Sequence, residues 1–308
     1  MPRLVAVGTA VPPFSFEQKQ IRETALHHFK TDLDNIERLL SIFDNVEVEK
    51  RHFCVPLEWF DRHHTFSEKN SEYIRWAERL SIEAIQNCLK KAQLCSNQVD
   101  HLVFVSTSGM STPSIDARIM NRLEFDRHTK RTPIFGLGCA GGAAGLSHCL
   151  DLARGAPDRR ILLVTLELSS LTFQSENYEK SNFVASALFA DGAAAGLICG
   201  DQCSENGVQM LDSLSTLWPG TLEVMGWEFS ETGLQVIFSK SIPDLLKKHL
   251  YGSIEMFLKR NQINLKDLAH YVIHPGGAKV LGAFQELLKL LPSQLRHSRF
   301  IIQIYGNM

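Results

Sequence analysis

The sequence predicts an α/β fold in which helices cover a parallel sheet. Strand-like apolar runs alternate with helix-like runs along most of the 308 residues. The order of these runs begins again after a polar turn at residues 201–207, which predicts two similar halves, residues 1–200 and 201–308. A composition of 44% hydrophobic and 21% charged residues is enough for a sizeable core.

The first half begins with a predicted strand at residues 4–7 and a helix at 17–29. A charged, histidine-rich stretch follows at residues 32–70, and we expect it to be an irregular surface insertion. Apolar residues recur at helical spacing over residues 73–92, which predicts a long amphipathic helix. The remaining predicted elements are, in order, strand 101–106, helix 114–123, strand 133–137, helix 140–153, strand 160–166 and strand 185–199.

The second half repeats this alternation but ends early. Its predicted elements are strand 208–217, strand 228–238, helix 242–259, strand 271–274, helix 278–291 and strand 300–305. In the first half, a helix and two strands follow the point that corresponds to the end of the chain. We therefore expect the second half to be incomplete, with a C-terminal part of roughly 60 residues missing.

The composition argues against several classes of protein. A net charge of −2 disfavours a nucleic-acid partner or a polybasic membrane surface. The cysteines at positions 54, 88, 95, 139, 149, 199 and 203 form neither a C-x-x-C pair nor a zinc-binding spacing, so we expect reduced thiols and no metal. No apolar run reaches the ~20 residues of a membrane helix, and the first residues do not form a signal peptide. We expect a soluble, cytoplasmic protein.

Cys139 is the first candidate catalytic residue. It lies in FGLGCAGGAAGL, residues 135–146, between a short apolar strand and a helix without a polar face, which we expect to be buried all round. The free N–H groups and the dipole at the start of this helix favour a thiolate, which suits a nucleophile. The alternative is a small cysteine that only fills a tight contact between helix and strand.

His274 and Asn307 are the other two candidates. His274 stands in YVIHPGGAKV, at the carboxyl end of a predicted strand, where open α/β sheets bind their ligands. Asn307 stands in YGNM, again directly after a predicted strand. A core histidine and an ordinary Gly-Asn turn are the alternatives. The three candidates support one another because each lies where a predicted strand ends.

Six motifs along the chain point to one family. They are VGTAVP at residues 7–12, STSG at 106–109, FGLGCAGG at 135–142, ALFADGAAAG at 187–196, HPGG at 274–277 and YGNM at 305–308. Together they resemble the type III polyketide synthases, the chalcone/stilbene synthase-like branch of the thiolase superfamily. The resemblance implies the duplicated αβαβα layered thiolase-like fold, with the second half incomplete.

The resemblance also implies a reaction. Cys139 would carry an acyl chain taken from acyl-CoA, and His274 would lower the pKa of its thiol. His274 and Asn307 would hold the enolate oxygen that forms when malonyl-CoA loses CO₂. Iterative condensation would then give a polyketide without a cofactor, a metal or a carrier protein.

Two residues and one sequence segment indicate which acyl-CoA starter the resemblance implies. Phe189 and Val236 match the family's two gatekeeper phenylalanines between the CoA tunnel and the cavity. The valine would widen this passage, although it is equally explained as a change in strand packing. The segment MGWEFSETGL resembles the corresponding segment of bacterial, alkylpyrone-synthase-like members, which take long fatty acyl starters. The expected products are therefore pyrones or resorcinols.

Other positions match substrate contacts in this family. Ser169 and Thr172 match the starter pocket, and Lys50 and Arg51 match a site for the CoA phosphates, with a solvated charge pair as the alternative. The loop STSGMSTPS would cross the interface of a homodimer, where Thr112 would enter the partner's cavity. The bond that follows it, to a proline, is expected to be cis.

Two other functional classes are left open by the sequence. One is a truncated, non-catalytic remnant of such an enzyme, because the missing C-terminal part would expose the core and leave residues 1–308 aggregated or inactive. The other is a ketoacyl synthase III-like condensing enzyme of fatty-acid synthesis. The HPGG motif and the lack of a basic patch for an acyl carrier protein disfavour this second class.

Overall fold

The computed structural model describes residues 1–28, 40–175, 177 and 179–308. Residue 29, at the end of the first predicted helix, and residues 32–39 of the predicted insertion lie outside the described residues. The described chain forms two compact units. Unit 1 comprises Met1–Pro13, Ser67–Leu171 and Asp191–Ser215, and unit 2 comprises Phe14–Phe66, Thr172–Ala190 and Thr216–Met308.

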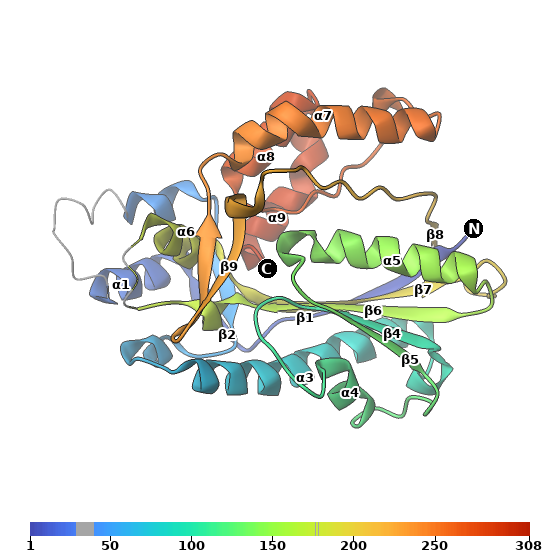
Figure 1. Ribbon diagram of the computed structural model, residues 1–308, viewed down its shortest axis with the longest axis horizontal. Helices are drawn as coiled ribbons and strands as arrows, with labels where there is room; N and C mark the ends of the chain where they lie inside the picture. Colours follow the sequence, from blue (N-terminus) through green and yellow to red (C-terminus); the bar gives the residue numbers. More distant parts are fainter. Residues whose placement is uncertain (29–39, 176, 178) are drawn as a thin grey trace. The chain divides into compact units, whose positions relative to one another are not determined.

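A six-stranded mixed sheet forms the centre of unit 1 (Figure 1). Its order is β5-β4-β6-β7-β1-β8, with the bounds β1 Arg3–Ala10, β4 His101–Val105, β5 Lys130–Ile134, β6 Arg160–Leu168, β7 Asp191–Cys199 and β8 Val208–Gln209. The strand β4 pairs in parallel with β5 and β6, whereas the pairs β6–β7, β7–β1 and β1–β8 are antiparallel. The prediction of a parallel sheet is wrong for these three pairs. The strands β6 and β7 are antiparallel because the chain leaves β6 and enters β7 at the same end of the two strands.

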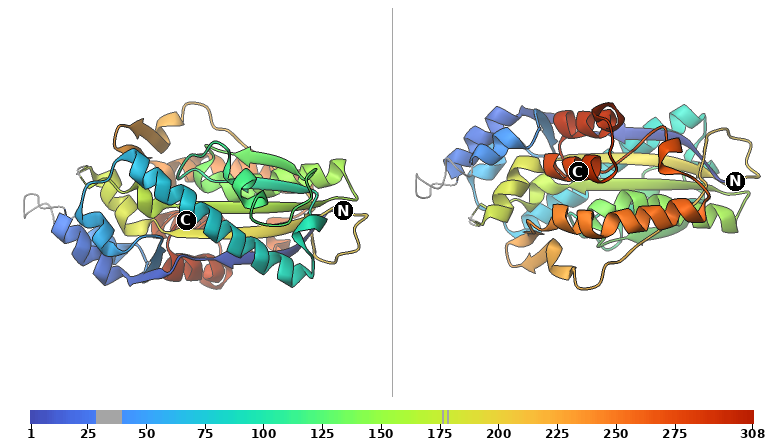
Figure 2. Two further views of the ribbon diagram at one scale, coloured as in Figure 1. Left: turned by 90° about the horizontal axis from the view of Figure 1, so that it is seen from below. Right: turned by 90° about the horizontal axis from the view of Figure 1, so that it is seen from above.

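Helices cover both faces of this sheet (Figures 1 and 2). The helix α5, Gly141–Gly155, packs on one face, and α3, Phe66–Ala92, lies with α4, Ile115–Met120, on the other. The prediction that α5 is buried all round is wrong, because only one of its faces, which includes Cys149, is buried against the sheet. At Gly145 a Cβ atom would come within 2.7 Å of a leucine side chain of β6, so the glycine permits close packing of helix on sheet.

Unit 2 contains two small sheets and most of the remaining helices. The strand pairs are β2 Phe14–Glu17 with β3 Lys50–Phe53, and β9 Met225–Ser230 with β10 Gly233–Phe238. The helices are α1 Gln18–His28, residues 40–45, α6 Lys180–Leu188, α7 Ile242–Arg260, α8 Ala278–Leu287 and α9 Arg296–Tyr305. Apolar residues of α1, β3, α6, α8 and α9 share one core.

Two predicted strands of unit 2 do not form, which matters for the candidate site. Residues 271–274 are extended but pair with no strand among the described residues, and their backbone is held by a side chain instead. The Ser298 hydroxyl accepts a hydrogen bond from the Ile273 N–H at 3.2 Å and donates one to the Ile273 carbonyl at 2.7 Å. Residues 300–305 belong to α9, because a short apolar run fits a helix with one buried face as well as a strand.

The bounds of several other helices and strands differ from the predicted ones. The strand predicted at 208–217 is only β8, and the strand predicted at 228–238 is the hairpin β9–β10, with a turn at residues 231–232. Residues 185–188 end the helix α6, and only residues 191–199 of the predicted strand form β7. The helices predicted at 114–123 and 278–291 are shorter, whereas those at 73–92, 140–153 and 242–259 are confirmed as α3, α5 and α7.

Among the helices that the structure describes, we find none that combines the length and the apolar character needed to span a lipid bilayer.

Replacing Ser298 with alanine should lower the free energy of unfolding by about 1–3 kcal/mol, because the N–H and the carbonyl of Ile273 lose their shared partner. The measurement is chemical denaturation of Ser298→Ala beside Ser293→Ala, an exposed serine of the same region. Equal stability of the two variants would contradict this account of how residues 271–274 are held.

Candidate active site

Cys139 lies at the edge of the unit 1 sheet where β4, β5 and β6 end. It is the central residue of a short 3₁₀ helix, η3 Gly138–Ala140, which joins β5 to α5. The two glycines before it, Gly136 and Gly138, have φ angles of 87° and 48°, a region that favours glycine. The Gly138 N–H donates to the Thr107 hydroxyl at 3.0 Å, which ties this turn to the chain just after β4. The half-buried Cys139 thus occupies the carboxyl edge of the parallel strands, as predicted.

The thiol of Cys139 is nevertheless a weak acid. Burial, together with a smaller effect of the nearby carboxylate of Glu167, raises the pKa of Cys139 to about 11. The backbone N–H of Cys139 itself acts in the opposite direction but has a smaller effect on the pKa. The backbone at the start of the helix thus favours the thiolate, as expected, but desolvation outweighs this effect. A nucleophilic Cys139 needs a base.

Glu167 is a neighbour of Cys139 that the sequence analysis did not select. It lies near the end of β6, and its carboxylate accepts a hydrogen bond from the Thr107 N–H at 2.9 Å. Burial raises the pKa of Glu167 to about 7, although hydrogen bonds from Ser108 and Thr107 lower it. The signal was present in the sequence, since a single acidic residue interrupts the apolar strand RILLVTLEL.

His274 occupies the turn between the extended segment and α8. The Gly276 N–H donates to the His274 carbonyl at 3.0 Å, and Gly277 adopts a φ of 147°, which explains the second glycine of HPGG. Within the described residues, the buried Nε2 atom of His274 has no hydrogen-bond partner. Burial lowers the pKa of His274, and the Asn307 side chain raises it by a smaller amount. A neutral imidazole with an unused nitrogen results.

Asn307 is held by its main chain against the end of α6. Its N–H donates to the Leu188 carbonyl at 2.8 Å, and its carbonyl accepts from the Ala190 N–H at 2.8 Å. The Asn307 side chain is buried, and its Nδ2 lies 3.5 Å from the Gly276 carbonyl oxygen. Unit 2 therefore brings Asn307 and the His274 turn together, although they are far apart in the sequence.

Arg51 does not lie where a CoA phosphate could reach it. Its side chain is fully buried, and its guanidinium donates to the carbonyls of Ser186 at 2.7 Å and Phe189 at 2.8 Å and to the side chain of Gln18 at 2.9 Å. The phosphate-binding role predicted for Arg51 disagrees with this position. Lys50 points to the opposite face of β3 and is half-buried, as strand alternation requires. Because the Lys50 and Arg51 side chains lie on opposite faces of β3, they cannot bind the same phosphate.

The predicted gate residues lie near each other in unit 2. Phe189 follows α6, and Val236 lies on β10 directly opposite Trp227 of β9. The Phe189 and Trp227 rings meet edge to face, with centroids 6.0 Å apart. The hairpin is fixed to this region by Gln174, whose amide donates to the Leu234 carbonyl at 3.1 Å. Trp227, which the sequence analysis did not select, thus supplies an aromatic ring beside the position where Val236 lacks one.

The remaining predicted residues are more dispersed. Ser169 and Thr172 lie in a short 3₁₀ helix, η4 Ser169–Thr172, directly after β6, and both are buried. Thr112 is exposed, and the predicted cis bond between Thr112 and Pro113 is confirmed. The entry of Thr112 into a partner's cavity stays a prediction.

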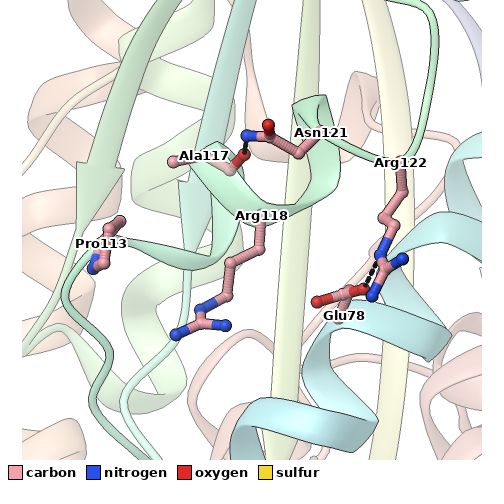
Figure 3. Close-up of a pocket in the computed structure, with 6 residues that line it drawn as sticks. All are labelled: Glu78, Pro113, Ala117, Arg118, Asn121 and Arg122. Atoms are coloured by element: carbon pink, nitrogen blue, oxygen red, sulfur yellow. Dashed lines mark hydrogen bonds and ion pairs between the residues drawn. The ribbon is translucent and has the colours of Figure 1, made fainter.

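A pocket of about 330 Å³ lies beside this loop, between α3 and α4 (Figure 3). Arginines and an amide surround it, and Arg122 donates to Glu78 at 2.6 Å across one side. It contains none of the predicted catalytic residues. Its lining residues are Glu78, Pro113, Ala117, Arg118, Asn121 and Arg122.

Comparison with protein families gives two adjacent matches. The description "chalcone and stilbene synthases, N-terminal domain" matches residues 2–202, and the corresponding C-terminal domain matches residues 209–308. Among individual proteins, a putative chalcone synthase of Bacillus subtilis is 38% identical over 99% of this chain and 87% of its own length. A 1,3,6,8-tetrahydroxynaphthalene synthase of Streptomyces peucetius is 33% identical over 99% of this chain and 81% of its own length.

Solved structures show the same fold. The crystal structure of 1,3,6,8-tetrahydroxynaphthalene synthase from Streptomyces coelicolor superposes with a TM-score of 0.93 at 27% identity, covering 99% of this chain and 86% of that one. The type III polyketide synthase domain of Steely1 from Dictyostelium also gives 0.93, at 23% identity over 100% of this chain and 88% of that one. The predicted thiolase-like α/β fold is confirmed.

Replacing Glu167 with glutamine should lower the pKa of the Cys139 thiol, because the isosteric amide removes a negative charge that repels the thiolate. The difference from the unmodified protein should appear above about pH 7, where Glu167 is ionised. The measurement is the pH dependence of Cys139 alkylation by iodoacetamide, followed by peptide mass spectrometry. Glu83→Gln, an exposed glutamate of α3, is the matched control. An unchanged or raised thiol pKa in Glu167→Gln would show that the carboxylate does not act on Cys139.

Proposed function

We propose, from the premise that this chain belongs to the chalcone and stilbene synthase family of type III polyketide synthases, that it extends a long-chain acyl-CoA starter held on Cys139. Enzymes of this family act on CoA thioesters and use neither a bound cofactor nor a carrier protein. The observation that carries the proposal is that each unit holds one unused group, a cysteine thiol at the end of the parallel strands of unit 1 and, in unit 2, a histidine Nε2 without a partner among the described residues.

The first proposed step is acyl transfer to Cys139. The raised pKa of the thiol means that a base must remove its proton, and the neutral His274 imidazole is suited to this role. The sulfur attacks the thioester carbonyl of the starter, and the CoA thiolate leaves. The acyl chain is then a thioester of Cys139.

The second proposed step is decarboxylation of malonyl-CoA. Loss of CO₂ leaves an electron pair that becomes an enolate, whose charge rests on the thioester oxygen. The proton carried by His274 Nε2 and the amide of Asn307 are the donors proposed for this oxygen. The enolate carbon attacks the Cys139 thioester, the cysteine thiolate leaves, and the chain has grown by two carbons. Repetition gives a polyketide that cyclises.

The proposed starter is a long fatty acyl chain, and the proposed products are pyrones or resorcinols. The support is Val236, which leaves one side of the gate without an aromatic ring. Trp227 opposes this effect, because it pairs with Val236 across the hairpin and its ring meets the ring of Phe189. We propose that these three side chains set the width of the passage, and that Ser169 and Thr172 line the starter pocket beyond it.

A second candidate product is favoured by the comparisons. Several relatives are named 1,3,6,8-tetrahydroxynaphthalene synthase. A naphthalene of this kind carries no alkyl chain, so malonyl-CoA alone would suffice for it. Incubation with malonyl-CoA, in the presence and absence of a long-chain acyl-CoA, separates the two products by mass.

The assembly and the surroundings of the enzyme are also proposals. Dimers are common in this family, and we propose a cytoplasmic homodimer in which Thr112 reaches the partner's cavity. Lys50 remains a candidate contact for the CoA phosphates, because its side chain is only half-buried. Neither proposal bears on the chemistry at Cys139.

Incubation with a long-chain acyl-CoA should leave an acyl adduct on Cys139, and Cys139→Ala should abolish condensation. Asn307→Ala should slow malonyl-CoA decarboxylation by about 100- to 1,000-fold, because one oxyanion donor is lost, and it should leave acyl loading nearly intact. His274→Ala should impair both steps. The measurements are peptide mass spectrometry for loading and CO₂ release for decarboxylation. An adduct on Cys149 or Cys199 with Cys139 unmodified would overturn the assignment.

Changes at the gate should alter the choice of starter in opposite directions. Val236→Phe adds a ring and should shift the preference to shorter acyl-CoA starters, whereas Trp227→Ala removes a ring and should shift it to longer ones. The measurement is the product profile with an equimolar series of acyl-CoA chain lengths. Phe229→Ala, an exposed aromatic of the same strand, is the matched control for Trp227. Identical profiles for all variants would reject the gate.

A further inference from the structure

Two cysteines and a glutamate meet at the end of the unit 1 sheet that lies opposite Cys139. The ligand atoms of Cys199, Cys203 and Glu205 all lie within 4.8 Å of one another. Cys199 ends β7 and pairs with Arg160 at the start of β6, whereas Cys139 lies beyond the other end of these strands. Since β6 has nine residues, the two places are roughly 26 Å apart along the sheet. The cluster is therefore separate from the candidate active site.

The turn that carries this cluster is held by backbone contacts. The Gly200 N–H donates to the Arg159 carbonyl at 3.0 Å, and the Gln202 N–H donates to the Pro157 carbonyl at 2.9 Å. A Cβ atom at Gly200 would come within 2.2 Å of the Pro157 oxygen, so glycine is required for this close approach. Figure 1 shows this connection at the end of the sheet near the N-terminus. The backbone of the turn between the two cysteines is thus fixed by these contacts.

The carboxylate of Glu205 gives a second, separate indication that a cation binds here. Its Oε1 accepts a hydrogen bond from Arg160 Nε at 2.7 Å. Its Oε2 is buried and has no hydrogen-bond partner among the residues that the structure describes. A buried carboxylate oxygen without a partner is costly, and a cation beside it removes this cost. The oxygen belongs to the same group of ligand atoms as the two sulfurs.

Charge and ligand type select the ion. Two thiolates and one carboxylate carry three negative charges, which a divalent ion and the guanidinium of Arg160 balance. Sulfur ligands favour Zn²⁺ over Mg²⁺ or Ca²⁺. The spacing Cys199-x₃-Cys203 falls within the range seen in zinc sites, although the sequence analysis did not recognise it, because the third ligand is a glutamate. Binding would displace the two thiol protons to water.

We propose that Cys199, Cys203 and Glu205 form a Zn²⁺ site, with water as the fourth ligand and Arg160 orienting the glutamate. The ion holds the end of β7 and the turn after it together, and Glu205 links them to the start of β6 through Arg160. The site is structural and takes no part in the condensation reaction.

The test is Zn²⁺ binding by the purified full chain under reducing conditions, measured by competition with a colorimetric chelator. The protein should bind about one equivalent, and Co²⁺ in place of Zn²⁺ should give a thiolate charge-transfer band. Cys203→Ser should abolish the band, and Glu205→Gln should weaken Zn²⁺ binding at least about tenfold. Cys95→Ser, an exposed free cysteine, and Cys139→Ala should bind as the unmodified protein does.

Three results would overturn the proposal. One is the absence of a thiolate band in the unmodified protein after reduction, which includes the case in which Cys199 and Cys203 form only a disulfide. Another is full binding by Cys203→Ser, which would place the ion on histidines. The third is loss of binding in Cys139→Ala. Thermal melts with and without Zn²⁺ provide a second readout, since the ion should raise the melting temperature of the unmodified protein and not that of Cys203→Ser.

Discussion

The placement of the candidate residues in unit 2 depends on one buried side chain, Arg51. A helix ends with carbonyl groups that have no partner within the helix, and at the end of α6 these carbonyls are buried. The guanidinium of Arg51 donates to two of them, at Ser186 and Phe189, and Gln18 both accepts from Arg51 and donates to the Ala187 carbonyl at 2.9 Å. The positive charge also lies at the negative end of the helix dipole. Lysine could not reproduce this planar set of donors.

Two functional features follow from this contact. The Phe189 carbonyl accepts a hydrogen bond from Arg51, and the Phe189 ring meets Trp227 at the proposed gate. The residues on either side of Phe189 bond the main chain of Asn307. Gly306, with a φ of 78°, must lack a side chain because a Cβ atom there would come within 2.9 Å of the aliphatic part of Arg51. The residues of the proposed gate and the proposed oxyanion donor are thus held by contacts to the same buried guanidinium.

The sequence predicted elements well where the pattern was long and poorly where it was short. The helices α3 and α7 show many turns of helical spacing, and both were predicted within a few residues of their bounds at the C-terminal end. The runs at 271–274 and 300–305 are too short to distinguish strand from helix, and the Ser298 contact that holds the first is not visible in sequence. Lys50 and Arg51 look alike in sequence, and only the alternation of β3 separates a buried side chain from a half-exposed one. The pKa of Cys139 likewise depends on Glu167, which belongs to another strand.

The acid–base properties of the candidate residues constrain how the proposed chemistry starts. The pKa of Cys139 is raised to about 11 and that of His274 is lowered, so each group alone is neutral near pH 7. A resting thiolate–imidazolium pair would have to overcome both shifts, whereas a neutral imidazole can accept the thiol proton as the sulfur attacks the thioester. In the proposed reaction this transfer would leave His274 protonated when malonyl-CoA decarboxylates, which is when a cationic donor would be most useful to the enolate. Glu167, with a pKa of about 7, becomes ionised as the pH rises and opposes the thiolate further. General-base catalysis by His274 therefore fits these groups better than a preformed ion pair does.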